Sequence, residues 1–192
     1  MWQSVLIQRA LPLAASYALL ILAALSLDVL LHAAHLAWIG RYLGLTGTVF
    51  LAASFGYSAR KQKMIKSGTV RLFLRMHCNA GWVGTLMILV HSGIHFNAVL
   101  PWTATALMMV VTASGHVGQY LLKKVKAEVT MKMKQLGIEG SADDAIEQQR
   151  FWDSVTVRAL GRWRSVHMPM VSFLLSLTIV HILSIAFFLN WR

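Results

Sequence analysis

Charged residues are scarce in this sequence: they make up 13% of the 192 residues, whereas 57% of the residues are hydrophobic. A soluble domain usually carries about 25% charged residues, so this balance predicts a membrane protein. Cysteine is nearly absent as well, since Cys78 is the only one. A single cysteine excludes a disulfide framework and a cysteine-based zinc or iron–sulfur site within the chain.

Acidic residues are also few: 7 Asp and Glu stand against 18 Lys and Arg, which gives a net charge of +11. Such an excess can indicate nucleic-acid binding. Here, however, the basic residues lie beside long apolar stretches, where they act as a topology signal. We therefore expect a membrane-lipid environment and no nucleic-acid partner.

Five apolar stretches are long enough to cross a bilayer as helices, because each has about twenty largely apolar residues. The sequence therefore predicts an all-α membrane protein with five transmembrane helices in a bundle. The first apolar run is too long for a cleaved signal peptide and lacks an obvious cleavage site. The predicted spans are Ala10–Ala34, Ile39–Ala59, Met76–Asn97, Trp102–Leu122 and Val166–Leu189.

The loops between these stretches predict the orientation. Sixteen of the eighteen Lys and Arg fall on one side of the predicted membrane, and only Arg41 and Arg192 fall on the other. The positive-inside rule makes the basic side cytoplasmic, so the N-terminus is expected inside and the C-terminus outside. Residues 123–165 form the long cytoplasmic connection, with a helical apolar pattern over 145–160. That amphipathic stretch suits either a helix lying over the bundle or a docking site for a soluble partner.

Four histidines repeat one interval on two of the predicted spans. His77 and His91 are fourteen residues apart on the third span, and His167 and His181 are fourteen apart on the fifth. Fourteen helical residues advance about 21 Å and return to within about 40° of the same face. Because both spans run outward, His77 and His167 (the first histidine pair) share one depth, and His91 and His181 (the second histidine pair) share another.

Matched imidazoles at two depths predict two stacked haems. Polar side chains inside a span are costly and usually serve a function, and two axial imidazoles are a common way to hold haem iron. No C-x-x-C-H motif is present, so both haems would be haem b, held without a covalent bond. The alternative is that these histidines form hydrogen bonds between helices. His95 competes with His91 as a ligand, but an eighteen-residue interval from His77 does not match the fifth span.

Glycines and arginines flank the first histidine pair. Gly81 and Gly84 follow His77 at four and seven positions, where a porphyrin could approach the backbone. Close helix packing explains these glycines nearly as well. Arg75 and Arg164 precede the histidines and are candidates to pair with haem propionates, although ordinary topology charges are an equally good explanation.

These residues resemble the ferric-reductase-like transmembrane and related di-haem cytochrome b proteins, over roughly residues 44–189. In that family two haems b lie between the third and fifth spans of this core. No segment after the fifth span could form the flavin- and nicotinamide-binding domain of full-length reductases, so we expect the membrane core alone. His116 is an extra histidine, which leaves different ligation open. The resemblance is carried by Arg75-Met-His77, Gly81-x-x-Gly84, His91-Ser-Gly-Ile-His95-Phe, Ser114-Gly115-His-Val-Gly118-Gln-Tyr120 and the His167/His181 pair.

Without a flavin site, a nucleotide loop or iron–sulfur ligands, the chain cannot start hydride chemistry alone. The expected function is electron transfer across the membrane between the quinone pool and a redox protein, such as a cytochrome c, an iron–sulfur protein or a flavoprotein. We expect the chain to be an electron-transfer subunit of a respiratory oxidoreductase, multi-pass in the bacterial cytoplasmic (inner) membrane. Two alternatives are a stand-alone reductase of an extracytoplasmic acceptor such as ferric ion, and a non-haem metal transporter or assembly subunit.

Polar residues near the outer face are candidates for quinone and proton chemistry. Asp28 and His32 are four residues apart and share a helix face, and His95 lies near the outer end of the third span. A histidine with a carboxylate suits proton transfer from a quinol. A buried stabilising pair is the alternative for Asp28 and His32, and His95 or His35 could instead bind a further haem.

Overall fold

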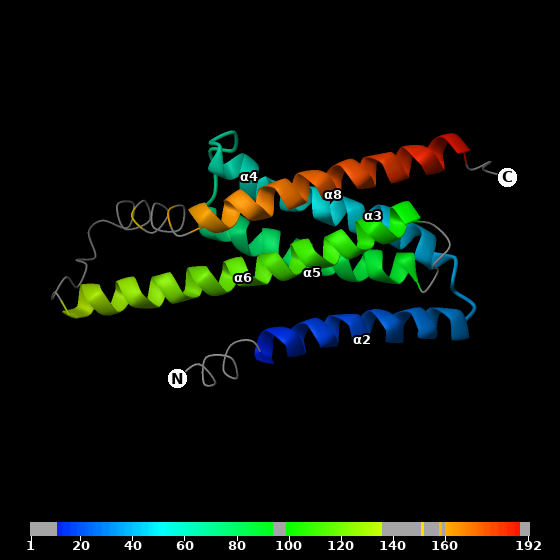
Figure 1. The fold of residues 1–192 in the computed structure, drawn as a ribbon, viewed down its shortest axis with the longest axis horizontal. Coiled ribbons are helices and arrows are strands. Elements are labelled where there is room, and N and C mark those ends of the chain that lie inside the picture. The colour runs from blue at the N-terminus through cyan, green and yellow to red at the C-terminus, as the bar shows by residue number, and fades with distance from the viewer. Residues whose placement is uncertain (1–10, 94–98, 136–150, 152–157, 159, 189–192) are drawn as a thin grey trace.

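The computed structural model describes residues 11–93, 99–135, 151, 158 and 160–188. Within these ranges the chain is helical and has no strand, which confirms the predicted all-α class. The described helices are α2 (Leu11–Ala33), α3 (Ile39–Ser54), α4 (Gly56–Lys61), α5 (Val70–Ser92), α6 (Val99–Gln135) and α8 (Gly161–Phe188), shown in Figure 1.

Three of the described helices are long and apolar enough to cross a membrane: Ala14–Ala33, Val70–Ser92 and Trp163–Phe188. A helix of 23 residues such as α5 is about 35 Å long, enough for a hydrocarbon layer of about 30 Å. Large apolar side chains on these helices point outward, among them Leu22 at 62% exposed and Phe173 at 58%. An apolar exterior on apolar helices is suited to lipid, as expected of a membrane protein.

The other two predicted spans differ from helices of simple spanning length. Residues 39–59 divide at Phe55 into α3, with 16 residues, and the short α4. Residues 102–122 lie inside α6, which continues through the basic segment to Gln135. That continuation is composed largely of good helix formers, and Lys124 pairs with Glu128 one turn later at 3.7 Å. The first part of the expected 123–165 connection is therefore helical, whereas the 145–160 pattern lies almost entirely outside the described residues.

The α5 helix begins six residues before the predicted Met76 and ends five before the predicted Asn97. The Thr69 hydroxyl accepts a hydrogen bond from the Leu72 amide at 3.1 Å and so caps the first turn. At the other end Gly93 adopts a positive φ of 52°, which favours glycine and terminates the helix. Apolar patterning missed the first turns because they contain two arginines, which are good helix formers but not apolar residues.

Helices α3 and α5 form the most extensive packed pair, and they run antiparallel. Three contacts share one register: Ser54 meets His77, Gly47 meets Gly84, and Gly40 meets His91. Each step moves seven residues, or two helical turns, in opposite directions along the two helices. At the midpoint a Cβ atom placed on Gly84 would lie 2.9 Å from the Gly47 carbonyl oxygen. The two backbones can approach this closely because neither residue has a side chain.

Helices α6 and α8 form a second antiparallel pair (Figure 1). Trp163 Nε1 donates a hydrogen bond to the Ser114 carbonyl at 2.9 Å, and its ring fills the space beside Gly118. The two pairs are joined where Thr85 of α5 and Thr112 of α6 share a hydrogen bond of 2.9 Å, with Thr85 fully buried. This contact fixes the α3–α5 pair against the α6–α8 pair.

Helix α2 lies to one side of the other helices (Figure 1). The Tyr17 hydroxyl donates a hydrogen bond to the Met109 carbonyl of α6. The Tyr17 ring also meets the His116 ring edge-on, with centroids 6.4 Å apart. The extensively packed helix pairs do not include α5 with α8, which run in the same direction. The space between those two helices holds the candidate site.

Candidate functional site

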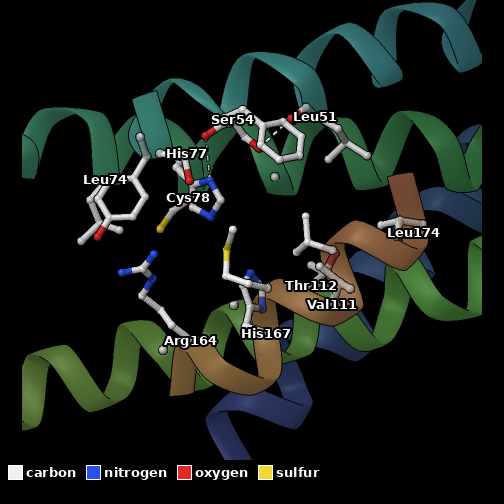
Figure 2. A pocket seen from close by; sticks show the side chains of 18 of the residues that line it. Leu51, Ser54, Leu74, His77, Cys78, Val111, Thr112, Arg164, His167 and Leu174 are labelled. Atoms are coloured by element: carbon white, nitrogen blue, oxygen red, sulfur yellow. Dashed lines mark hydrogen bonds between the residues drawn. The ribbon is translucent and has the colours of Figure 1, made fainter. Parts of the chain in front are cut away.

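A largely apolar pocket lies between the α3–α5 pair and the α6–α8 pair. Its empty space is about 1450 Å³, including the part that opens to the surroundings. Figure 2 shows His77 and His167 reaching into it from opposite sides, from α5 and α8. His116 of α6 also lines this pocket. The structure therefore brings the first histidine pair to one cavity, as its matched depth predicted.

His77 is held by α3 rather than by its own helix. Its Nδ1 lies 3.0 Å from the Ser54 carbonyl oxygen, and a carbonyl can only accept, so Nδ1 carries the proton. The other ring nitrogen, Nε2, then keeps its lone pair. Metal-ligating histidines usually donate their second nitrogen in this way, which fixes the ring and its tautomer.

His167 lies on the opposite wall and is 5% exposed. Its ring stacks on Trp163 with centroids 4.3 Å apart, and its Nδ1 lies 3.1 Å from the Ser114 hydroxyl. The Ser114 hydroxyl can accept from Nδ1 or donate to it; in the tautomer in which it accepts, Nε2 is left unprotonated here too. Two imidazoles, each oriented by a neighbouring helix, thus approach the same space.

In the second histidine pair, fourteen residues further along α5, His91 is held by α3 in the same way as His77. His91 Nδ1 donates to the Gly40 carbonyl at 2.9 Å, so α3 orients both histidines of α5. The His91 ring lies so close to Gly44 that a Cβ there would come within 2.7 Å of it. His181 on α8 is partly buried. Its pairing with His91 stays a prediction.

The predicted glycines divide between pocket and packing. Gly81 and Gly115 line the pocket, and a Cβ on either would meet nothing within 4 Å. Gly84 does not share that wall: it is buried against Gly47 and Leu51 of α3. Gly84 lies on the face of α5 that meets α3, as His77 and His91 do, so close packing explains Gly84, whereas Gly81 faces open space.

The predicted cations divide in the same way. Arg164 lines the pocket, and its guanidinium points into it in Figure 2. Arg75 is exposed and is not among the residues lining the pocket. Lys61, at the end of α4, does line it and was missed by the sequence analysis. The sequence signal that could have indicated Lys61 is its spacing from Tyr57. The two residues are four apart and so share a helix face, and Tyr57 also lines the pocket.

A second pocket lies beside His91 and includes the predicted polar group of α2. Asp28 and His32 form a contact of 3.4 Å, and both line this pocket with Arg41 and His91. His95, the third member of the predicted quinone site, lies outside the described residues. His35 is exposed in the connection between α2 and α3, with a positive φ of 57°.

His116 differs from the four paired histidines in how it is held. Its Nδ1 faces the Thr112 carbonyl of its own helix at 3.2 Å, and its ring packs edge-on against Trp82 at 4.4 Å. Both contacts are ordinary features of a packed helix. His116 nevertheless stands in the same pocket as the first histidine pair, so ligation by it is open to test.

The first pocket fits a haem on the chemistry of its residues. It offers two facing imidazoles, a mainly apolar lining, two glycines without neighbours and cations at one end. Across the described ranges no group of three or more His, Cys, Asp or Glu is gathered to hold a metal ion directly. The donor set therefore suits two axial positions of a planar macrocycle rather than a complete coordination sphere supplied by side chains.

Fold and site together define a helical protein whose described residues include three helices long and apolar enough to cross a membrane and a pocket lined by histidines. Comparison with protein-family models, curated proteins and solved structures finds no match to this chain. The resemblance noted above therefore depends on the histidines and their surroundings alone.

Proposed function

We propose that this protein is a di-haem cytochrome b of five transmembrane helices, with its N-terminus in the cytoplasm and its C-terminus outside. The observation that supports the proposal best is the orientation of the α5 histidines. His77 and His91 both donate Nδ1 to carbonyls of α3, at Ser54 and Gly40, which lie fourteen residues apart as the histidines do. Two Nε2 atoms are thereby left available at two depths of α5, and α8 carries two histidines, His167 and His181, at the same interval.

In this proposal each residue set has a separate task. The first and second histidine pairs hold the iron of two haems from both sides, and haem supplies the one-electron chemistry that side chains lack. The α3 carbonyls and Trp163 keep the imidazoles oriented. The apolar lining excludes water, and Gly81 and Gly115 leave room for the flat face of the ligand.

The two histidine levels are separated by about 21 Å along α5, which spans most of a hydrocarbon layer. Two redox centres at these levels would carry electrons from one membrane face toward the other. We propose that one end exchanges electrons with quinone and the other with a redox protein, within a respiratory complex of the bacterial cytoplasmic membrane.

A visible absorption spectrum of the purified protein tests this function directly. We expect b-type bands after dithionite reduction and, by pyridine haemochrome assay, about twice as much haem as protein chain. Protein that is folded by circular dichroism but binds no haem would overturn the proposal. That outcome would favour the non-haem transporter or assembly subunit.

Quinol oxidation releases protons as well as electrons, so its site needs a base. We propose that His95, with Asp28 and His32, supplies it near the second histidine pair. Replacing His95 by alanine should abolish haem reduction by a short-chain quinol while leaving haem content near wild type. Stopped-flow absorbance at the haem bands measures the rate, and dithionite gives the total reducible haem.

His35→Ala is the matched control for this experiment. His35 is another histidine of the same membrane side, and its variant should keep both the haem content and the quinol rate. Unchanged kinetics in the His95 variant would contradict the quinone assignment. A loss of haem in either variant would instead show that the residue binds a further haem.

A further inference from the structure

Lys61 is a cationic residue in the lining of the first pocket. Its ammonium nitrogen is shielded from solvent and has no hydrogen-bond partner among the residues that the structure describes. Lys61 stands at the end of α4, and both Tyr57 and Ser58 on that helix line the same pocket. A buried ammonium is costly unless an anion or several acceptors compensate it, so this position calls for a negatively charged ligand.

Arg164 adds a second positive charge to the same space. It lies three residues before His167 on α8, and Figure 2 shows its guanidinium directed into the pocket rather than away from it. No Asp or Glu is found among the pocket-lining residues in the described part of the chain. Two cations without a carboxylate make this end of the pocket a binding site for an anion.

The position of the two cations relative to the histidines defines the shape of that anion. Ser54 at the end of α3 faces His77, and Lys61 lies on the next helix, α4, which also packs against α5. Arg164 precedes His167, so both cations stand at the N-terminal end of α5 and α8, beyond the imidazoles. A matching ligand has a flat apolar body at the imidazoles and a carboxylate at one edge.

We propose that Lys61 and Arg164 together bind a propionate carboxylate of the haem held by the first histidine pair. Arg75, which is exposed and lies outside the pocket lining, takes no part. The assignment rests on the proposed function, since it needs haem between His77 and His167. It adds a residue, Lys61, and a direction: the propionate edge of this haem faces the end of the bundle where α4 lies.

Redox titration of the purified protein tests the assignment. Reduction adds negative charge to the haem, so a nearby cation favours the reduced state and raises the midpoint potential. Lys61→Gln and Arg164→Gln should each shift the potential of one haem downward and leave the other unchanged. Lys61→Arg and Arg164→Lys keep the charge and should stay close to wild type, whereas Arg75→Gln should change neither potential.

The outcomes separate this inference from the function beneath it. Wild-type protein without b-type bands would refute the cytochrome itself. Two haems whose potentials are both unchanged by Lys61→Gln or by Arg164→Gln would overturn the role of that residue. If a glutamine variant loses one haem altogether, restoration of that haem by the charge-conserving variant supports the proposal. Failure of the charge-conserving variant would instead show a purely structural role and would overturn it.

Discussion

Replacing His77 by alanine is expected to halve the haem content of the purified protein. The variant removes one of the two imidazoles of the first histidine pair, and the remaining His167 cannot hold a six-coordinate low-spin iron alone. The second pair, about 21 Å away along α5, should retain its haem. His167→Ala should give the same loss, and the double variant should lose no more than either single variant, because the two residues hold one group.

Haem content should respond in the complementary way to substitutions in the second histidine pair. His91→Ala and His181→Ala should each remove the other haem, so a variant lacking one ligand from each pair should bind none. Pyridine haemochrome assay against protein concentration measures the content, and low-temperature electron paramagnetic resonance distinguishes the two haems. A His77 variant with full haem content and an unchanged low-spin signal would contradict the ligand assignment.

His116→Ala is the matched control because His116 lines the pocket of the first pair. Its Nδ1 faces its own helix, and its ring packs between Trp82 and Tyr17, so the alanine variant should keep both haems. Loss of haem in this variant, with full content in His167→Ala, would show that α6 rather than α8 supplies the ligand. The control thus addresses the one extra histidine by which the sequence departs from the family pattern.

The sequence was most informative about features that depend on the geometry of a single helix. The all-helical fold followed from apolar stretches of about twenty residues, and three of them are helices able to cross a membrane. The fourteen-residue interval predicted which histidines would meet, since helical geometry alone relates residues on one helix and parallel helices preserve the relation. His77 and His167 line one pocket in the structure, whereas the pairing of His91 with His181 stays a prediction.

Features that depend on a third helix were not predictable in this way. Nothing in the pattern of α5 shows that the backbone carbonyls of Ser54 and Gly40 on α3 accept hydrogen bonds from its two histidines. Gly84 was assigned to the pocket because it shares a helix face with His77, but that face also meets α3, and Gly84 packs there against Gly47 and Leu51. Lys61 was hidden among topology charges, because only the packing of α4 against α5 brings it into the lining of the pocket.

The α3–α5 contact is consequently the part of the fold on which both histidine levels depend. Substitution of Gly84 by leucine should destabilise the protein by roughly 1–3 kcal/mol, the usual cost of forcing a larger side chain into a packed site. Even its Cβ would lie 2.9 Å from a backbone carbonyl of Gly47, which cannot move as the end of a side chain can. As α3 is pushed away, the carbonyls of Ser54 and Gly40 withdraw from both histidines of α5. We therefore expect partial loss of both haems, together with a lower midpoint of unfolding in mixed sodium dodecyl sulfate micelles.

Gly81→Leu separates packing from ligand binding on the same helix. A Cβ at position 81 meets nothing within 4 Å, so this variant should unfold close to the wild-type midpoint. Its side chain would instead occupy the pocket beside the first histidine pair and should displace only that haem. Equal losses of both haems and equal unfolding midpoints in the two variants would contradict this division. The contrast decides whether a glycine of α5 serves the helix pair or the cavity, because the two positions lie one turn apart and differ only in what they face.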